Sequence, residues 1–225
     1  MERFWGCHVP LAGGLASCIK NGEALGVNTI QIHPSAPQRW NSKPFAPGIE
    51  QDYLTAKASS SIRKVFFHGI YLINLANPDP AKFHLSKLSL VHYLDLAARV
   101  GADGVIFHVG SNKDQVQEQD GFKQAARGIN WILEKSDNQA KLLLEVSAGA
   151  GKIIGDKLEE LAEIYSAVDD KTRVGFALDT QHMWASGYNW REDLEAIVAQ
   201  VKSVLGMDKV WAIHLNDSMT EVDSK

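Results

Sequence analysis

Seven short apolar segments, separated by longer amphipathic stretches, constrain the fold of this chain more than any other feature. Each segment is nearly continuous in apolar character, as is typical of parallel strands covered on both faces. They lie at 6–9, 28–33, 65–68, 105–108, 142–145, 174–179 and 210–214. From the second onward their ends are 34 to 40 residues apart, the length of a strand–helix unit. This alternation predicts an α/β fold with a parallel sheet.

The stretches between these segments carry apolar residues at helical spacing. Such patterns occur over 15–25, 82–100, 158–167 and 194–205. In the second stretch one broad apolar face, predicted to pack against the sheet, carries Leu85, Leu88, Leu90, Tyr93, Leu94 and Ala97. The sequence therefore predicts helices that cover the sheet.

Ionisable residues end five successive apolar segments, namely His68, His108, Glu145, Asp179 and His214. In a (β/α)₈ barrel the carboxyl ends of the strands converge around one axis, and enzymes of this fold place their chemistry there. In a doubly wound open sheet the same side chains would spread along a line. The pattern therefore favours a TIM-type (β/α)₈ barrel. His182 follows Asp179 by three residues, and a loop could fold it back to the same mouth.

Each of these residues also has an ordinary structural explanation. A single histidine at a strand end is more often an internally hydrogen-bonded residue than a ligand, and a single carboxylate there is commonly a helix N-cap or turn residue. Five strands with the same layout are difficult to explain by capping, so the set is interpreted as a metal centre. His8 is interpreted as a residue that supports the ligands, and the role of His33 is left open.

Four imidazoles and two carboxylates form a donor set too rich in nitrogen for calcium or magnesium. Zinc is the first choice, with manganese or iron as alternatives. Six ligands exceed what one tetrahedral zinc requires, so at least two metal ions are predicted. Paired ions about 3.5–4 Å apart activate water and stabilise both oxygens in phosphate-ester hydrolysis. Glu145, with two oxygens, is the predicted bridge.

Composition narrows the class of protein without fixing the function. The 225 residues include 23 Lys and Arg against 27 Asp and Glu, a formal net charge of −4. This excludes a strongly basic nucleic-acid coat but not DNA binding through a local patch or bound metals. No apolar run approaches the ~18 residues of a membrane span. Only Cys7 and Cys18 are present, which favours a reducing compartment and a cytoplasmic location.

The glycine-rich segment 147–155 follows a predicted strand but does not match a phosphate-binding loop. Ile153 stands where Ser or Thr would follow the lysine, and Val146 stands at the first glycine position. The segment is interpreted as a mobile loop at the barrel mouth, and no organic cofactor is predicted.

The sequence resembles the endonuclease IV family of apurinic/apyrimidinic DNA endonucleases from its first predicted strand to its last residue. The motifs that carry the resemblance occur in family order. They are Gly6-Cys-His-Val with Ala12-Gly-Gly-Leu15, Gln38-Arg-Trp40, His68 with Tyr71-Leu-Ile-Asn-Leu75, His108-Val-Gly-Ser111, Glu145 with Ala148-Gly149, Leu178-Asp-Thr-Gln-His182 with Gly187-Tyr188, and His214-Leu-Asn-Asp217.

The resemblance implies a trinuclear zinc barrel that cleaves the phosphodiester 5′ to an abasic site in double-stranded DNA during base excision repair. It assigns the first zinc to His68 and His108, the second to Asp179 and His214, and the third to His182. Glu145 would bridge the first two ions as the catalytic residue. Gln38, Arg39 and Tyr71 match loops that probe the DNA minor groove, although Tyr71 and Trp40 are also compatible with ordinary loop packing.

Several departures from the family pattern bear on activity. Val146-Ser147 replaces Asn-Thr after the bridging glutamate, Gln181 replaces Cys, and Val109 replaces Pro. The chain also ends before the family's Asp-Arg-His element and its eighth strand with a metal-binding Glu. We therefore expect residues 1–225 to form a single xylose isomerase-like TIM-barrel domain with seven of eight strands and an incomplete third zinc site. The family is monomeric, but exposed edge strands are expected to favour self-association.

Two other functions compete with the nuclease. A sugar isomerase or epimerase of the same barrel superfamily would use Glu145, Asp179 and His214 around one divalent ion and leave His68 and His108 without a role. An inactive fragment that keeps weak metal or DNA binding is the non-enzymatic alternative. The number of metal ions bound per chain distinguishes the first two.

Overall fold

The computed structural model describes residues 3–36, 38–40 and 45–225. Seven strands form one sheet in chain order, and all six neighbouring pairs are parallel. The strands are β1 (Gly6–His8), β2 (Thr29–Ile32), β3 (Lys64–His68), β4 (Gly104–Phe107), β5 (Leu142–Glu145), β6 (Val174–Asp179) and β7 (Val210–His214). Each coincides with a predicted apolar segment to within two residues at either end.

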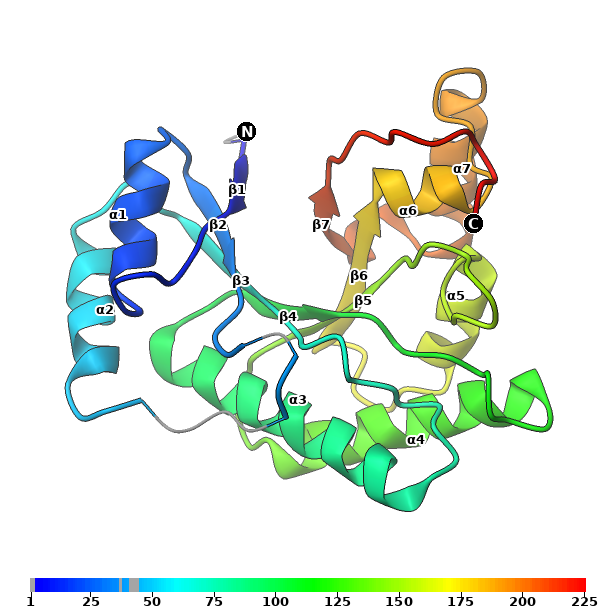
Figure 1. Cartoon of the computed structure of the whole chain (residues 1–225), viewed down its shortest axis with the longest axis horizontal. Helices are drawn as coiled ribbons and strands as arrows, with labels where there is room; N and C mark the ends of the chain where they lie inside the picture. The colour runs from blue at the N-terminus through cyan, green and yellow to red at the C-terminus, as the bar shows by residue number, and fades with distance from the viewer. Residues whose placement is uncertain (1–2, 37, 41–44) are drawn as a thin grey trace.

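Helices cover the outer side of this sheet, which curves into an open half-barrel (Figure 1). They are α1 (Ser17–Ala24), α2 (Ile49–Ala58), α3 (Pro80–Val100), α4 (Glu118–Lys135), α5 (Leu158–Ser166), α6 (Thr180–Ala185) and α7 (Leu194–Val204), with a 3₁₀ turn, η1, at Met207–Lys209. The predicted TIM-type fold is thus confirmed as an incomplete barrel. None of the helices within the described residues has the length and apolar character needed to cross a membrane.

The half-barrel is open between β1 and β7, which lie on opposite sides of the opening in Figure 1. Among the described residues each of these strands has only one strand neighbour. In β7 the side chain of Ile213 is 56% exposed, and that of Leu215, directly after the strand, is 87% exposed. Exposed apolar edges of this kind favour association, so self-association stays a prediction.

Side chains alternate between the two faces of each strand. This alternation places the ionisable residues at the ends of β3 to β7 on the inner face of the sheet. Outward-facing residues such as Phe67, Leu144 and Phe176 join the main core beneath the helices. Inward-facing residues form a second, small cluster of Ile106, Leu143 and Ala177 with Phe66, Trp211 and Ala212 packed against it. Two residues further along β3 to β7, on the same inner face, come the ionisable residues of the mouth.

Trp211 fills the inner space because the β6–β7 pairing contains an irregularity. The register shifts between Phe176 and Ala177, so that Phe176 pairs with Val210 and Ala177 with Ala212. The indole then lies against Gly175, where an added Cβ would come within 2.5 Å of the ring. Gly175 therefore makes room for the tryptophan that closes the inner face below the mouth.

Arg173 is a buried cation at the opposite end of the sheet from the mouth, just before β6. Its guanidinium donates to the carbonyl oxygens of Leu133 at 3.0 Å, Ser136 at 3.1 Å and Ala140 at 3.2 Å. It also donates to the Ser136 hydroxyl at 2.9 Å. The partners are the last carbonyls of α4 and the following loop, where the helix dipole favours a positive charge. Arg173 thereby ties α4 to β5 and β6.

The predicted buried face of α3 is wrong at two positions. Leu85 is 41% exposed and Leu88 is 44% exposed, whereas Leu90, Leu94 and Ala97 are buried as predicted. Buried residues recur at Ser86, Leu90, Tyr93, Ala97 and Val100. This stripe at helical spacing leaves Leu85 and Leu88 on its flank.

Candidate metal centre

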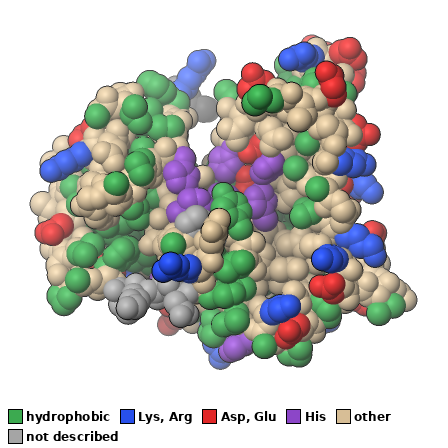
Figure 2. Space-filling model, viewed as in Figure 1, with side chains coloured by type: hydrophobic (Ala, Val, Ile, Leu, Met, Phe, Trp, Pro, Cys, Tyr) green, Lys and Arg blue, Asp and Glu red, His purple; other side chains and the backbone are tan. Residues whose placement is uncertain are grey.

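The carboxyl ends of β3 to β7 bring the predicted ligands together at the mouth of the half-barrel. Figure 2 shows most of the visible histidine side chains, in purple, gathered around this opening, with red Asp or Glu side chains beside them. Glu145, at the end of β5, lies in the middle and is 1% exposed. The other ligands approach it from the neighbouring strands on both sides. A convergence of this kind is what the barrel prediction required.

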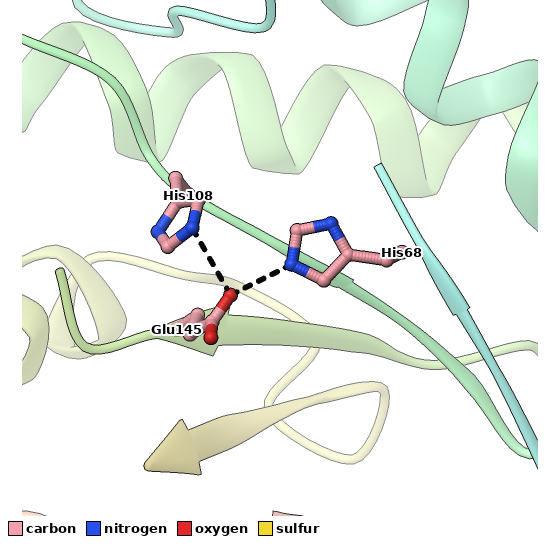
Figure 3. Close-up of side chains that lie close together, drawn as sticks. All are labelled: His68, His108 and Glu145. Atoms are coloured by element: carbon pink, nitrogen blue, oxygen red, sulfur yellow. Dashed lines mark hydrogen bonds and ion pairs between the residues drawn. The ribbon is translucent and has the colours of Figure 1, made fainter. Parts of the chain in front are cut away.

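One group of candidate ligands lies on the β3–β4 side of Glu145. The Nε2 atom of His68 is 2.9 Å from Oε2 of Glu145, and the Nε2 atom of His108 is 3.3 Å from the same oxygen (Figure 3). His68 is the last residue of β3, and His108 follows the last residue of β4. The ligand atoms of these three residues all lie within 4.8 Å of one another.

A second group lies on the β6–β7 side and shares the same glutamate. The Nδ1 atom of His214 is 2.6 Å from Oε1 of Glu145 and 3.6 Å from Oδ2 of Asp179. Glu145, Asp179 and His214 again place one ligand atom each within 4.8 Å. The two oxygens of Glu145 thus face different groups, as the predicted bridging role requires.

His182 lies beside these groups but belongs to neither. Its Nδ1 is 3.8 Å from both Oε1 of Glu145 and Oδ2 of Asp179, and it donates to the carbonyl oxygen of Val146 at 2.9 Å. The expectation that a loop carries His182 is wrong, since it lies in the first turn of α6. Asp179 causes this: its Oδ1 accepts the backbone N–H of His182 and caps the helix.

Residues behind the ligands fix the orientation of their rings. The Nδ1 of His68 donates to the carbonyl oxygen of Gly69 at 2.9 Å, which leaves Nε2 facing Glu145. The Nδ1 of His108 lies 3.0 Å from the hydroxyl of Ser147, a residue at which this chain departs from the family pattern. Asn216 donates to Oδ2 of Asp179 at 2.7 Å. Sequence reasoning marks Ser147 as a departure from the family pattern near the ligands, but it does not find the supporting role of Asn216.

Electrostatics within the cluster keep its carboxylates ionised. Burial would raise the pKa of Glu145, but hydrogen bonds with His214 and His68 hold it well below the ordinary value. Burial also opposes protonation of His214, yet contacts with Asp179 and Glu145 raise its pKa to about 9. For His108 burial dominates and lowers the pKa to about 4. At neutral pH the centre therefore holds buried carboxylates next to a protonated His214 and a neutral His108.

This donor set fits divalent metal ions. Each group combines imidazole nitrogen with carboxylate oxygen, which suits zinc and also accommodates manganese or iron. Buried carboxylates need a compensating charge, and a cation between the rings would supply it. Because Glu145 is common to both groups, the arrangement suits two neighbouring ions better than one.

The residues predicted to contact DNA lie in the loops that follow β2 and β3. Gln38 and Arg39 are exposed. Tyr71 is 64% exposed, and its ring centre lies 6.3 Å from that of His68. Trp40 is half-buried and packs against the core, which agrees with ordinary loop packing. Tyr71 thus stands exposed beside the ligands.

Fold and site together define the class of protein as a TIM-barrel enzyme with a cluster of histidines and carboxylates at the strand ends that could hold metal ions. In agreement, residues 19–225 match the family model described as Xylose isomerase-like TIM barrel. A D-tagatose 3-epimerase-like protein shares the fold, with a TM-score of 0.75 at 16% identity over 97% of this chain and 79% of that chain.

Closer relatives place the chain within this class. It is 31% identical to the probable endonuclease 4 of Thermoplasma acidophilum over 98% of this chain and 75% of the relative. It is 32% identical to the apurinic-apyrimidinic endonuclease of Caenorhabditis elegans, covering all of this chain and 57% of the relative. The crystal structure of endonuclease IV from Thermus thermophilus superposes with a TM-score of 0.85, at 28% identity over 96% of this chain and 77% of that one. The chain belongs to the endonuclease IV family.

Proposed function

We propose that this chain is a zinc-dependent endonuclease that hydrolyses the phosphodiester 5′ to abasic sites in double-stranded DNA. The observation that carries the proposal is the pair of ligand groups that share Glu145 at the barrel mouth. The names of the relatives, endonuclease 4 and apurinic-apyrimidinic endonuclease, support the reaction and the substrate. A single-metal sugar isomerase would need only Glu145, Asp179 and His214, and would leave the close approach of His68 and His108 unexplained.

The residues at the mouth divide the work of the proposed reaction. His68 and His108 would hold one ion, Asp179 and His214 a second, with Glu145 bridging them and His182 available beside them. When bound, zinc ions supply an activated water and stabilise charge on the phosphate oxygens. Burial of Glu145 and Asp179 excludes bulk water from their oxygens, and their neighbours keep them ionised, as the depressed pKa of each carboxyl indicates.

The exposed loops would select the substrate. An abasic nucleotide has no base to unstack, so turning it out of the helix costs little and favours the damaged site. A side chain inserted into the minor groove can hold the bent duplex. Tyr71, exposed next to His68, is placed to do this, with Gln38 and Arg39 on the neighbouring loop.

Metal counting and incision test this function together. We expect the zinc-loaded chain to bind at least two ions, measured by mass spectrometry of the metal content. It should cut a labelled duplex that carries one abasic analogue and leave an undamaged duplex intact. Treatment with a chelator should abolish cutting, and zinc should restore it. One ion per chain with sugar epimerisation would support the isomerase, and metal binding without incision would support the inactive alternative.

Replacing Tyr71 with Ala separates DNA recognition from metal binding. Because aromatic contacts with nucleic acid contribute about 1–3 kcal/mol, we expect kcat/KM for the abasic duplex to fall about tenfold or more. The zinc content should not change, since Tyr71 belongs to neither ligand group. Tyr165→Ala in α5, on the outer side of the sheet, is the control. Wild-type incision by Tyr71→Ala would contradict a role in binding DNA.

A further inference from the structure

Gln31 is a polar side chain inside the half-barrel to which neither the sequence motifs nor the proposed ligand groups give a role. It lies in β2 and is partly buried. Its Oε1 atom is 2.7 Å from Nε2 of His214, and its Nε2 atom is 3.3 Å from Nδ1 of His8. One amide therefore contacts two histidines from the two edge strands of the sheet.

The geometry points to Gln31 as a positioning residue of the metal centre, which holds the His214 ring with Nδ1 turned to the space between Glu145 and Asp179. This inference rests on the metal centre of the proposed function. The amide oxygen can only accept a hydrogen bond, so the Nε2 of His214 must carry the hydrogen. The nitrogen left for a metal is Nδ1, the atom that faces Glu145 and Asp179. A partner of this kind fixes the tautomer and direction of a ligand histidine.

His8 keeps the amide in the required orientation. The amide nitrogen of Gln31 donates to Nδ1 of His8. If the amide turned over, its NH₂ group would face the N–H of His214, and two donors would oppose each other. His8 thus supports the ligand His214 indirectly, through Gln31, which is consistent with the interpretation of His8 from the sequence.

The contact also spans the opening of the half-barrel. Gln31 and His214 are 183 residues apart, and theirs is the one hydrogen bond between the β1–β2 side and β7 in the described part of the chain. β7 has no second strand neighbour among those residues, so the backbone restrains it on one side only. Gln31 supplies a restraint on the other side, at the position of the ligand.

Two substitutions test this role through metal affinity. Gln31→Leu removes the acceptor for His214, and we expect one of the two zinc ions to bind about ten- to a hundredfold more weakly. Gln31→Glu keeps an acceptor at the same position and should bind both ions at least as tightly as the wild type. Thr29→Val, on the same strand and face but outside the cluster, is the control. Zinc affinity is measured by competition with a chromophoric chelator.

The folded state of each variant is checked separately, by thermal unfolding of the metal-free protein. A loss of affinity in Gln31→Leu with restoration in Gln31→Glu supports the inference, because a merely structural role would not be restored by the charged side chain. Wild-type affinity in Gln31→Leu, or equal loss in both variants, overturns it and leaves the proposed function intact. A wild-type protein that binds no zinc would overturn both.

Discussion

Replacing Glu145 with Gln is expected to remove both metal ions and nearly all activity. The neutral amide has one oxygen, so it cannot serve the two ligand groups that share the carboxylate. It also removes the negative charge that offsets two adjacent cations. Metal ions contribute several kcal/mol to stabilising the transition state, so incision of an abasic duplex should fall roughly a thousandfold or more. Zinc content and incision rate are measured side by side.

The control for this substitution is Glu163→Gln on the exposed face of α5, which should keep both zinc and activity. The glutamine introduced in Glu145→Gln has the size of the natural side chain, so the metal-free variant should retain the circular dichroism spectrum of the wild type. Full zinc content in Glu145→Gln would show that the carboxylate is not the bridge.

Arg173→Met is expected to produce the largest loss of stability. Methionine fills a similar volume but leaves the buried carbonyl groups of Leu133, Ser136 and Ala140 without their donor. A buried acceptor without a partner costs about 1–3 kcal/mol, and several are affected here. We expect the free energy of unfolding to fall by about 3–5 kcal/mol, measured by urea denaturation in the presence of a chelator.

Arg127→Met on the exposed face of α4 is the matched control and should change stability by less than about 0.5 kcal/mol. Arg173→Lys should fall between the two, since an ammonium can reach only some of the same carbonyl groups. An unfolding midpoint for Arg173→Met equal to that of the wild type would show that the carbonyls find other partners.

The strands and most candidate ligands of this protein can be predicted from sequence because both recur at regular spacings along the chain. Apolar runs at regular intervals mark the strands, and the ionisable residue that ends each run lies on the inner face by alternation along the strand. Hence His68, His108, Glu145, Asp179 and His214 are all found at one mouth.

Sequence reasoning misses or misplaces residues that belong to no repeating pattern. Gln31 is one polar residue in an apolar strand, and only the fold reveals that His214 lies beside it. The sequence places His182 in a loop because a six-residue helix is too short to show amphipathic spacing, and the cap of that helix is the predicted ligand Asp179. Leu85 and Leu88 are exposed although the helical pattern predicts that they are buried. An error of one residue in locating the buried face of a helix is enough to misplace such residues.

The ligand groups and the side chain that orients His214 come from different parts of the sheet. All members of the two ligand groups come from the ends of β3 to β7, an unbroken run of paired strands, and none comes from β1 or β2. The β1–β2 edge therefore supplies no member of either ligand group. A displacement of that edge would act on the ligands through the hydrogen bond between Gln31 and His214, the one that joins the β1–β2 side to β7 in the described part of the chain. The direction of the His214 ring is thus coupled to movement of the barrel wall.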